Sequence, residues 1–163
     1  MVLQIPGFQQ VFDNGDRFAQ TRTAAVMPQA TTTVFTVAGG PIKILDLISL
    51  CVTDNNTNAA TQQWSFDGTL GSATTISNAS ASLASLVAGD MTVLDMTALT
   101  TAVRIIATGT SGGLAAAAGH IGLYLNGAGL IRNIIGTAAT TGTWNHYLRY
   151  RPLASGVTVT PAF

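Results

Sequence analysis

Short apolar runs separated by turn residues fill the chain from residue 31 onward. Residues 31–37 (TTTVFTV) alternate between polar and apolar side chains and stop at the Gly-Gly-Pro of residues 39–41. Further runs of this kind cover residues 101–108, 120–126, 129–137 and 143–150. A period of two indicates β-strands, and many short strands joined by Gly-rich turns are typical of sandwiches and barrels. The pattern therefore predicts an all-β protein, a jelly-roll-like β-sandwich of about eight strands over residues 31–163.

The most apolar of these runs is residues 42–52 (IKILDLISLCV). Strict alternation along it predicts one face made of Ile42, Ile44, Ile48, Leu50 and Val52, and an opposite face containing Leu45, Leu47 and Cys51. A strand that is apolar on both faces is buried on both, either inside a sandwich or against another subunit. The next run, residues 62–67, places Trp64 and Phe66 on one face and predicts that Trp64 helps to lock the core.

Residues 1–30 lack this sustained alternation. They hold Phe8, Phe12 and Phe18 together with turn signals at Asn14-Gly15 and Pro28. We interpret the segment as an irregular N-terminal arm or lead-in rather than a separate domain. The three Phe side chains need a surface to cover them, which is either their own core or a neighbouring subunit.

The closing segment concentrates aromatic and basic residues that the rest of the chain lacks. Alternation places one set inward, as residues that lock the core: Trp144, His146, Leu148 and Tyr150. The opposite face carries Tyr147, Arg149 and Arg151, and this mixture of an aromatic ring with arginines is typical of the centre of a protein interface. The alternative is a solvated strand face on which long side chains cover apolar surface. After Pro152, a turn and a return strand with Val157 and Val159 inward predict a terminal hairpin.

Charge is scarce: one Lys, six Arg, seven Asp and no Glu among 163 residues. With no Glu and a single Lys, the chain has almost none of the residues that normally cover exposed helices, and its 24 Thr favour strands instead. A net charge near zero promotes association with other subunits. The basic residues are dispersed, so we expect no nucleic-acid partner. The amino-terminal residues show no basic and apolar leader and no run long enough for a membrane span, so we expect synthesis in the cytoplasm without a signal peptide, and no membrane partner.

No motif for catalysis, metal or cofactor binding stands out. Asp54, Asn56 and Asn58 have the spacing of the first ligands of a calcium loop, but the Gly and Glu that complete such a loop are replaced by Ala59 and Ser65. No nucleophile motif accompanies the many serines, and neither histidine has metal-ligand spacing. The sequence therefore predicts a protein that is not an enzyme and that uses no cofactor.

Three segments give the chain a family resemblance: VFTVAGGPIKILDLISLCVT (residues 34–53), QQWSFDGTLGSATTI (62–76) and TWNHYLRYRPLASGVTVTPA (143–162). Over residues 33–162 it resembles the capsid decoration, or cement, proteins of tailed bacteriophages, in which a G-G-x-I/V-x-I strand opens the β-domain and a W-x-x-x-L-R-Y-x-P-L-x-x-G-x-x-V segment closes it. The resemblance implies a β-sandwich that forms a homo-oligomer, commonly a trimer, on an icosahedral shell, with no catalytic residues.

The sequence thus leads to one functional expectation and one alternative. We expect a structural virion protein on the capsid surface, with the major capsid protein and further copies of itself as partners. Phe8, Phe12, Phe18, Tyr147, Arg149 and Arg151 are the candidate interface residues. The alternative is a carbohydrate- or receptor-binding module of a phage tail or head fibre, with the rings of Trp64 and Tyr124 as its platform.

Overall fold

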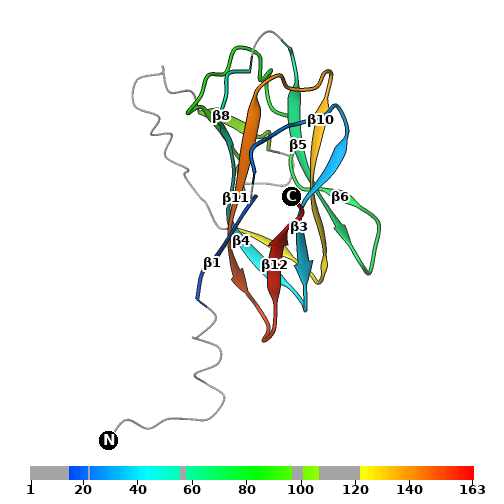
Figure 1. Ribbon diagram of the computed structural model, residues 1–163. Helices are drawn as coiled ribbons and strands as arrows, with labels where there is room; N and C mark the ends of the chain where they lie inside the picture. Colours follow the sequence, from blue (N-terminus) through cyan, green and yellow to red (C-terminus); the bar gives the residue numbers. More distant parts are fainter. Residues whose placement is uncertain (1–14, 22, 56–57, 97–100, 107–121) are drawn as a thin grey trace, which may run out of the picture.

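Two antiparallel β-sheets packed face to face make up the fold in the computed structural model, which describes residues 15–21, 23–55, 58–96, 101–106 and 122–163 (Figure 1). The seven strands of the large sheet are β1 (Arg17–Gln20), β2 (Ala25–Val26), β4 (Ile42–Cys51), β7 (Met91–Val93), β8 (Arg104–Ile106), β9 (Leu123–Leu125) and β11 (Thr143–Pro152). The five strands of the small sheet are β3 (Thr31–Ala38), β5 (Thr61–Gly68), β6 (Thr74–Thr75), β10 (Gly129–Gly136) and β12 (Thr158–Pro161).

Each sheet combines strands from both halves of the chain. The large sheet runs β1-β11-β4-β7-β8, with β2 also paired to β11 and β9 to β4, and the small sheet runs β12-β3-β10-β5-β6. Strand β11 thus lies between β1 and β4, and β10 lies between β3 and β5. The predicted all-β sandwich is confirmed.

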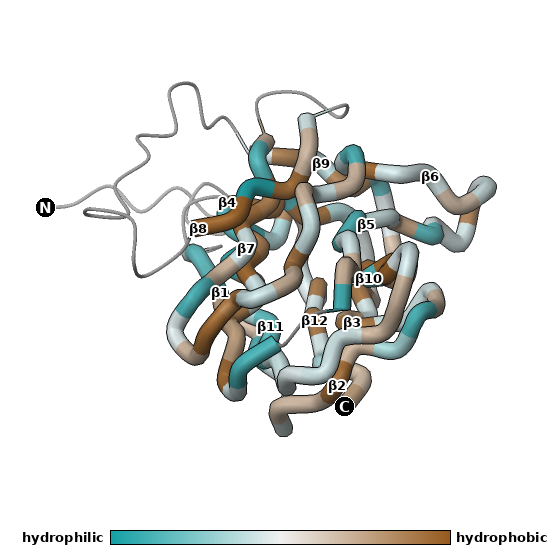
Figure 2. The backbone as a smooth tube through the Cα atoms, turned by 90° about the horizontal axis from the view of Figure 1, so that it is seen from above, coloured by the Kyte–Doolittle hydropathy of each residue, from teal (hydrophilic) through white to brown (hydrophobic). Residues whose placement is uncertain are grey.

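The core fills the space between the two layers. Figure 2 shows the backbone of both layers from above. Its largest fully buried side chains include Trp64, Trp144, Phe35, Ile42, Ile44, Leu47, Ile131 and Leu148. A smaller apolar cluster around Trp144, Leu83 and Leu86 closes one end beneath the loops that follow β5. Each fully buried Leu or Ile contributes about 1.5–3 kcal/mol by leaving water, so the inward-facing rows supply most of the driving force for folding.

Strand β4 contains a β-bulge that overturns the predicted assignment of its faces. Asp46 is paired with Arg149 and Ile44 with Tyr150, so Leu45 is the extra residue in the ladder. Two residues of β4 oppose one of β11 at this point, and the alternation resumes shifted by one position. Leu47, Ser49 and Cys51 therefore face the core together with Ile42 and Ile44, while Ile48 and Leu50 face outward.

The lead-in predicted for residues 1–30 does not stay outside the sandwich over its whole length. Strand β1 pairs with the Tyr147–Tyr150 part of β11, and β2 pairs with Thr143 and Trp144. Backbone pairing along the open edge of β11 holds these residues, although only Ala19 of β1 is buried in the core. Residues 1–14, with Phe8 and Phe12, lie outside the described residues.

The predicted terminal hairpin is also wrong. Strand β12 pairs with β3 in the small sheet, whereas β11 belongs to the large sheet. Between them the chain crosses from one layer to the other, and Val157 and Val159 are buried between the layers as predicted. The Tyr150 hydroxyl accepts a hydrogen bond of 3.3 Å from the backbone N–H of Val159, which ties β11 to β12 across the edge of the sandwich.

Candidate interaction surface

The outer face of the large sheet carries a continuous group of apolar side chains. Because Thr92 of β7 is buried, its neighbours Met91 and Val93 point outward, as the alternation of a strand requires. The register of the sheet then aligns outward side chains in two rows across the strands. We define the apolar face as Ile48, Leu50, Met91, Val93, Ile106 and Tyr147, each of which is partly exposed.

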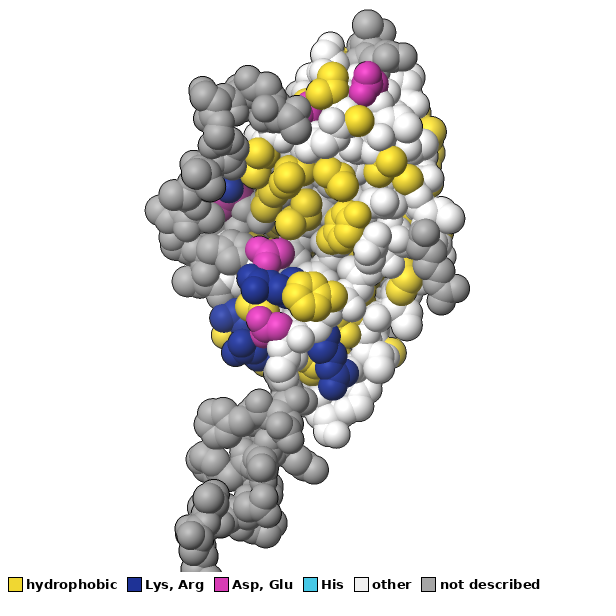
Figure 3. Space-filling view, turned by 60° about the vertical axis from the view of Figure 1, so that its left-hand side comes forward, with side chains coloured by type: hydrophobic (Ala, Val, Ile, Leu, Met, Phe, Trp, Pro, Cys, Tyr) yellow, Lys and Arg dark blue, Asp and Glu magenta, His cyan; other side chains and the backbone are white. Residues whose placement is uncertain are grey.

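The rows show how closely these side chains are brought together. Tyr147 lies opposite Ile48, which in turn lies opposite Val93. Leu50 lies opposite Met91, which in turn lies opposite Ile106. Directly paired residues of an antiparallel sheet have Cβ atoms about 4.5–5.5 Å apart, so each row forms a continuous strip. Figure 3 shows hydrophobic side chains gathered across the middle of this side of the molecule.

A cluster of opposite charges borders the apolar face. Arg149 Nε lies 2.6 Å from the Asp46 carboxylate, and the guanidinium of Arg151 binds Asp16 through two contacts of 2.9 and 3.0 Å. Arg149 also lies 3.8 Å from Asp16, which connects the two pairs. These four side chains, the charged rim, carry no net charge between them, and Figure 3 shows Lys/Arg and Asp/Glu side chains grouped at one end of the hydrophobic area.

Phe18 extends this surface at the edge of the sheet. It lies on β1 directly opposite Arg149, and the residue is 75% exposed. A large aromatic ring left in water beside a charged rim resembles the aromatic and arginine anchors of protein interfaces. The fold thus brings Phe18, Tyr147, Arg149 and Arg151 to one side of the large sheet, although Phe18 is 129 or more residues away from the others in sequence.

The apolar face includes residues that the sequence did not single out. Met91 and Val93 flank Thr92 in an alternating triplet, and Ile106 ends a run of three residues in β8. The alternation signals strands, but the sequence does not reveal which strands are neighbours. Their position next to β4 emerges only from the sheet order.

The residues predicted to lock the core lie in the interior. Trp64, Trp144, His146, Leu148 and Tyr150 are each at most 4% exposed. The Trp64 and His146 rings meet edge to face, with centroids 5.6 Å apart. These contacts join the small sheet, which carries Trp64, to the large sheet, which carries His146.

A buried chain of hydrogen bonds surrounds His146. The Ser49 hydroxyl lies 2.8 Å from His146 Nδ1 and accepts a hydrogen bond of 2.9 Å from the Gln62 amide, whose oxygen accepts one from Thr92. A hydroxyl has one proton and two lone pairs, so Ser49 pairs with Gln62 and with Nδ1 at the same time, as donor or acceptor to the ring according to its tautomer. Burial lowers the pKa of His146 from 6.5 to about 4, so the ring is neutral near pH 7.

This hydroxyl–imidazole pair is not arranged for nucleophilic catalysis. Ser49 is 0% and His146 1% exposed, so a substrate carbonyl cannot reach the hydroxyl without opening the core. The partner of Ser49 on its other side is the Gln62 amide rather than a carboxylate. The arrangement instead satisfies four buried polar side chains at the centre of the sandwich.

The part of the chain that the structure describes contains no cluster of metal-binding side chains. No three His, Cys, Asp or Glu side chains in these ranges gather closely enough to hold an ion. In the loop with calcium-like spacing, Asp54 accepts a hydrogen bond of 2.8 Å from the Ala88 N–H, and the Asn58 amide donates one of 3.0 Å to the Ala139 carbonyl. Both side chains fasten neighbouring loops together.

The aromatic platform required by a carbohydrate-binding module is only half present. Trp64 is 1% exposed and cannot contact a sugar, whereas Tyr124 is 63% exposed. Lys43 Nζ lies 5.2 Å from the centroid of the Tyr124 ring, within the range of a cation–π interaction. Beside the ring, a groove of about 340 Å³ runs between β9 and the loop that carries Leu70, with Asn126 and Thr74 also in its wall.

Comparisons of the chain with protein-family models, with curated proteins and with solved structures give no match. Among the described residues, no helix is long and apolar enough to cross a membrane.

Proposed function

We propose that this protein is a structural virion protein that binds the outer surface of a tailed-phage capsid and stabilises it. In this role it is a decoration or cement protein without catalysis, and it acts as a homo-oligomer, a trimer by resemblance. The observation that carries the proposal is the apolar face of the large sheet. Six apolar or aromatic side chains that are partly exposed in two aligned rows are what a subunit interface requires and what a solvated sheet face normally lacks.

The charged rim supports the same proposal. A protein interface typically combines an apolar centre with a polar border, and arginine and tyrosine are enriched among its strongest contacts. Here Arg149 and Arg151 are already neutralised by Asp46 and Asp16, so docking does not bury an uncompensated charge. Phe18 adds an exposed ring at the same border.

The mechanism is stabilisation by mass action. A protein that binds only the assembled shell raises the stability of that shell by an amount that grows with its concentration over its Kd. Several copies on one lattice bind with avidity, so modest contacts at each site suffice. A chain with seven positive and seven negative side chains also has little long-range repulsion between closely spaced copies.

A pair of lysine substitutions tests the proposal. Val93→Lys adds a charge to the apolar face, where Val93 lies between Ile48 and Arg104. Thr36→Lys places the same charge on the outer face of β3 in the small sheet, where Thr36 is also partly exposed. Purified protein is mixed with undecorated capsids of the phage and sedimented with them. We expect wild type and T36K to co-sediment and to raise the temperature at which the capsids release their DNA, and V93K to lose both effects.

Two results would contradict this proposal. If wild-type protein, folded by its circular dichroism spectrum, does not bind the capsids, the proposed function is wrong. If V93K binds as well as T36K, docking uses another surface. Sedimentation velocity of the three proteins without capsids shows in addition whether the same face holds the homo-oligomer together.

The groove beside Tyr124 favours a second candidate function, a carbohydrate- or receptor-binding module. Its exposed ring stands next to amide and hydroxyl groups, including those of Asn126 and Thr74. Binding to a glycan array by wild type but not by a Tyr124→Ala variant would favour this function over capsid binding. The loss of Trp64 from the platform weakens the candidate, because a single ring offers a sugar little stacking area.

A further inference from the structure

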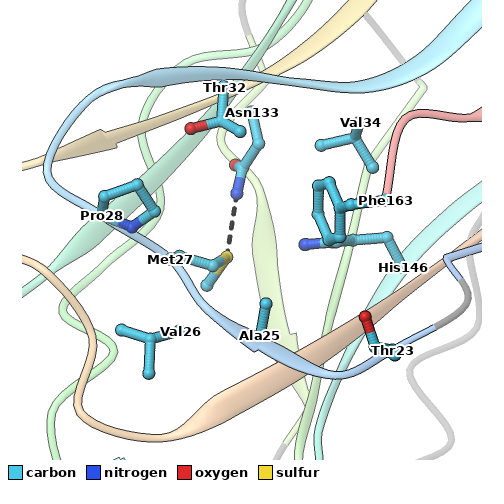
Figure 4. Close-up of a pocket in the computed structure, with 10 residues that line it drawn as sticks. All are labelled: Thr23, Ala25, Val26, Met27, Pro28, Thr32, Val34, Asn133, His146 and Phe163. Carbon is cyan, nitrogen blue, oxygen red and sulfur yellow. Dashed lines mark hydrogen bonds between the residues drawn. The ribbon is translucent and has the colours of Figure 1, made fainter.

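A second cavity lies between the edges of the two sheets, away from the apolar face. It has a volume of about 210 Å³ and is bounded by β2, β3, β10, β11 and the last residue of the chain. Figure 4 shows its ten lining residues arranged around a central space, to which Met27 and Phe163 contribute opposite walls. Val26 and Pro28 at its border are exposed, so the cavity opens to solvent.

Most of the wall is apolar. Val34 and Met27 are at most 4% exposed, and the Phe163 ring meets His146 edge to face with centroids 6.2 Å apart. An apolar cavity of about 150 Å³ in another protein takes up benzene and stays free of water, so the larger space here accommodates a six-membered ring with a substituent. The polar side chains in the wall are Thr23, Thr32, Asn133 and His146.

One polar atom in the wall is left without a partner. Asn133 of β10 is 2% exposed, and its amide points into the cavity (Figure 4). The amide nitrogen lies 2.8 Å from Met27 Sδ, whereas Oδ1 is buried and accepts no hydrogen bond. A buried acceptor without a donor costs about 1–3 kcal/mol, so its presence calls for an explanation in a ligand or in strain.

From the cavity and the orphaned oxygen together we propose that this pocket binds a small, largely apolar molecule, about the size of a phenol, that carries one O–H or N–H donor. The donor is satisfied by Asn133 Oδ1, and the apolar body fills the space between Met27 and Phe163. The site is independent of the apolar face, so it adds a ligand to the proposed structural role and does not depend on it.

The test compares phenol with toluene, which has nearly the same shape and no donor. Binding is followed by the NMR signal of the Met27 methyl group in protein labelled at methionine methyls. Wild type is compared with Asn133→Leu, which keeps the branched outline of the side chain and removes its polar atoms; the larger Leu side chain affects both probes, so the ratio of their affinities is compared. Because a hydrogen bond contributes about 1 kcal/mol, we expect N133L to lower the ratio of phenol to toluene affinity by about 5- to 10-fold.

Ala25→Leu serves as a second variant that leaves Asn133 in place. Ala25 lines the cavity from β2 and is partly exposed, so a larger side chain there fills the space without disturbing the core. We expect A25L to weaken both probes at least 10-fold. The proposal is overturned if neither probe shifts the Met27 signal of wild type at millimolar concentration, or if the phenol-to-toluene ratio is the same in wild type and N133L. Preference for anisole, an acceptor without a donor, over phenol would also overturn it.

Discussion

Acid should destabilise this protein through a single side chain, His146. Its ring is buried among Ser49, Trp64 and Phe163, and burial lowers its pKa from 6.5 to about 4. In the unfolded chain the same ring is exposed and titrates near 6.5. Between pH 6.5 and pH 4 the unfolded state therefore binds a proton that the folded state does not bind. The free energy of unfolding falls as the pH falls through this window.

The size of the effect follows from the same two values. A pKa that is lower by about 2.5 in the folded state corresponds, at 1.36 kcal/mol for each, to about 3 kcal/mol of stability lost between pH 7 and pH 4. Domains of this kind are stable by only about 5–15 kcal/mol, so protonation of one ring removes a substantial fraction of the total.

Urea unfolding at pH 7.5, 6.5, 5.5 and 4.5 measures this loss. The matched variant is His146→Asn, whose side-chain amide lies near the position of Nδ1, can donate to or accept from Ser49, and does not titrate. The smaller side chain lowers stability equally at every pH, and the seven Asp and His120 are present in both proteins and cancel. We expect the free energy of unfolding of wild type to approach or cross that of H146N as the pH falls.

Two curves that stay parallel from pH 7.5 to pH 4.5 would refute the reasoning. An imidazole signal of His146 that titrates near 6.5 in the folded protein would refute it directly. Such a midpoint would mean that the hydrogen bond to Ser49, or water entering the core, stabilises the protonated ring enough to offset the cost of burying its charge.

Two further predictions concern the interior. Burial raises the pKa of the Cys51 thiol from 9.0 to about 11. We therefore expect iodoacetamide at pH 8 to alkylate this single cysteine at least about 100-fold more slowly in native protein than in urea. Mass spectrometry measures both rates. A Cβ on Gly142 would clash with the backbone oxygen of Thr53, whereas one on Gly71 meets nothing within 4 Å. We expect Gly142→Ala to lower the free energy of unfolding by about 2–4 kcal/mol and Gly71→Ala to lower it by less than about 0.5 kcal/mol. Similar melting temperatures of the two variants in thermal unfolding would contradict this packing.

The sequence predicts the class of fold because alternation is strong where one face of a strand is buried. Strand β11 is the clearest case: its inward and outward residues separate along its whole length, and the structure buries the inward set. Strand β4 gives no such guidance, because large apolar residues occupy both of its faces. Either phase then satisfies the pattern, and the bulge at Leu45 selects one that alternation alone does not reveal.

The edges of the sheets were the least predictable part of the fold. Strand β1 contributes one buried apolar residue, Ala19, so its sequence carries almost no periodic signal. It is a strand because β11 has unpaired backbone N–H and C=O groups along that edge. The signal for this strand therefore lies in β11 and not in the sequence of β1. In the same way β12 follows β11 closely in sequence but pairs with β3, because Val157 and Val159 reach the core from that side.

The candidate surface was predictable only in part, for a related reason. Tyr147, Arg149 and Arg151 lie on one strand, so alternation alone places them on a common face. Met91 and Val93 come from a distant part of the chain, and only the order of the strands brings them beside Ile48. Phe8 and Phe12 remain predictions because they precede the described residues.

The extra residue at Leu45 also bears on how the chain can change over generations. Deletion of Leu45 would leave a strand of similar hydrophobicity, so the mutation need not abolish folding. The shortened strand would alternate regularly from Ile44 through Asp46 and Leu47, so Ser49 would still face the interior and Ile48 would still face water. A subunit built this way can gain or lose the extra residue of its central strand and still present the same contact surface.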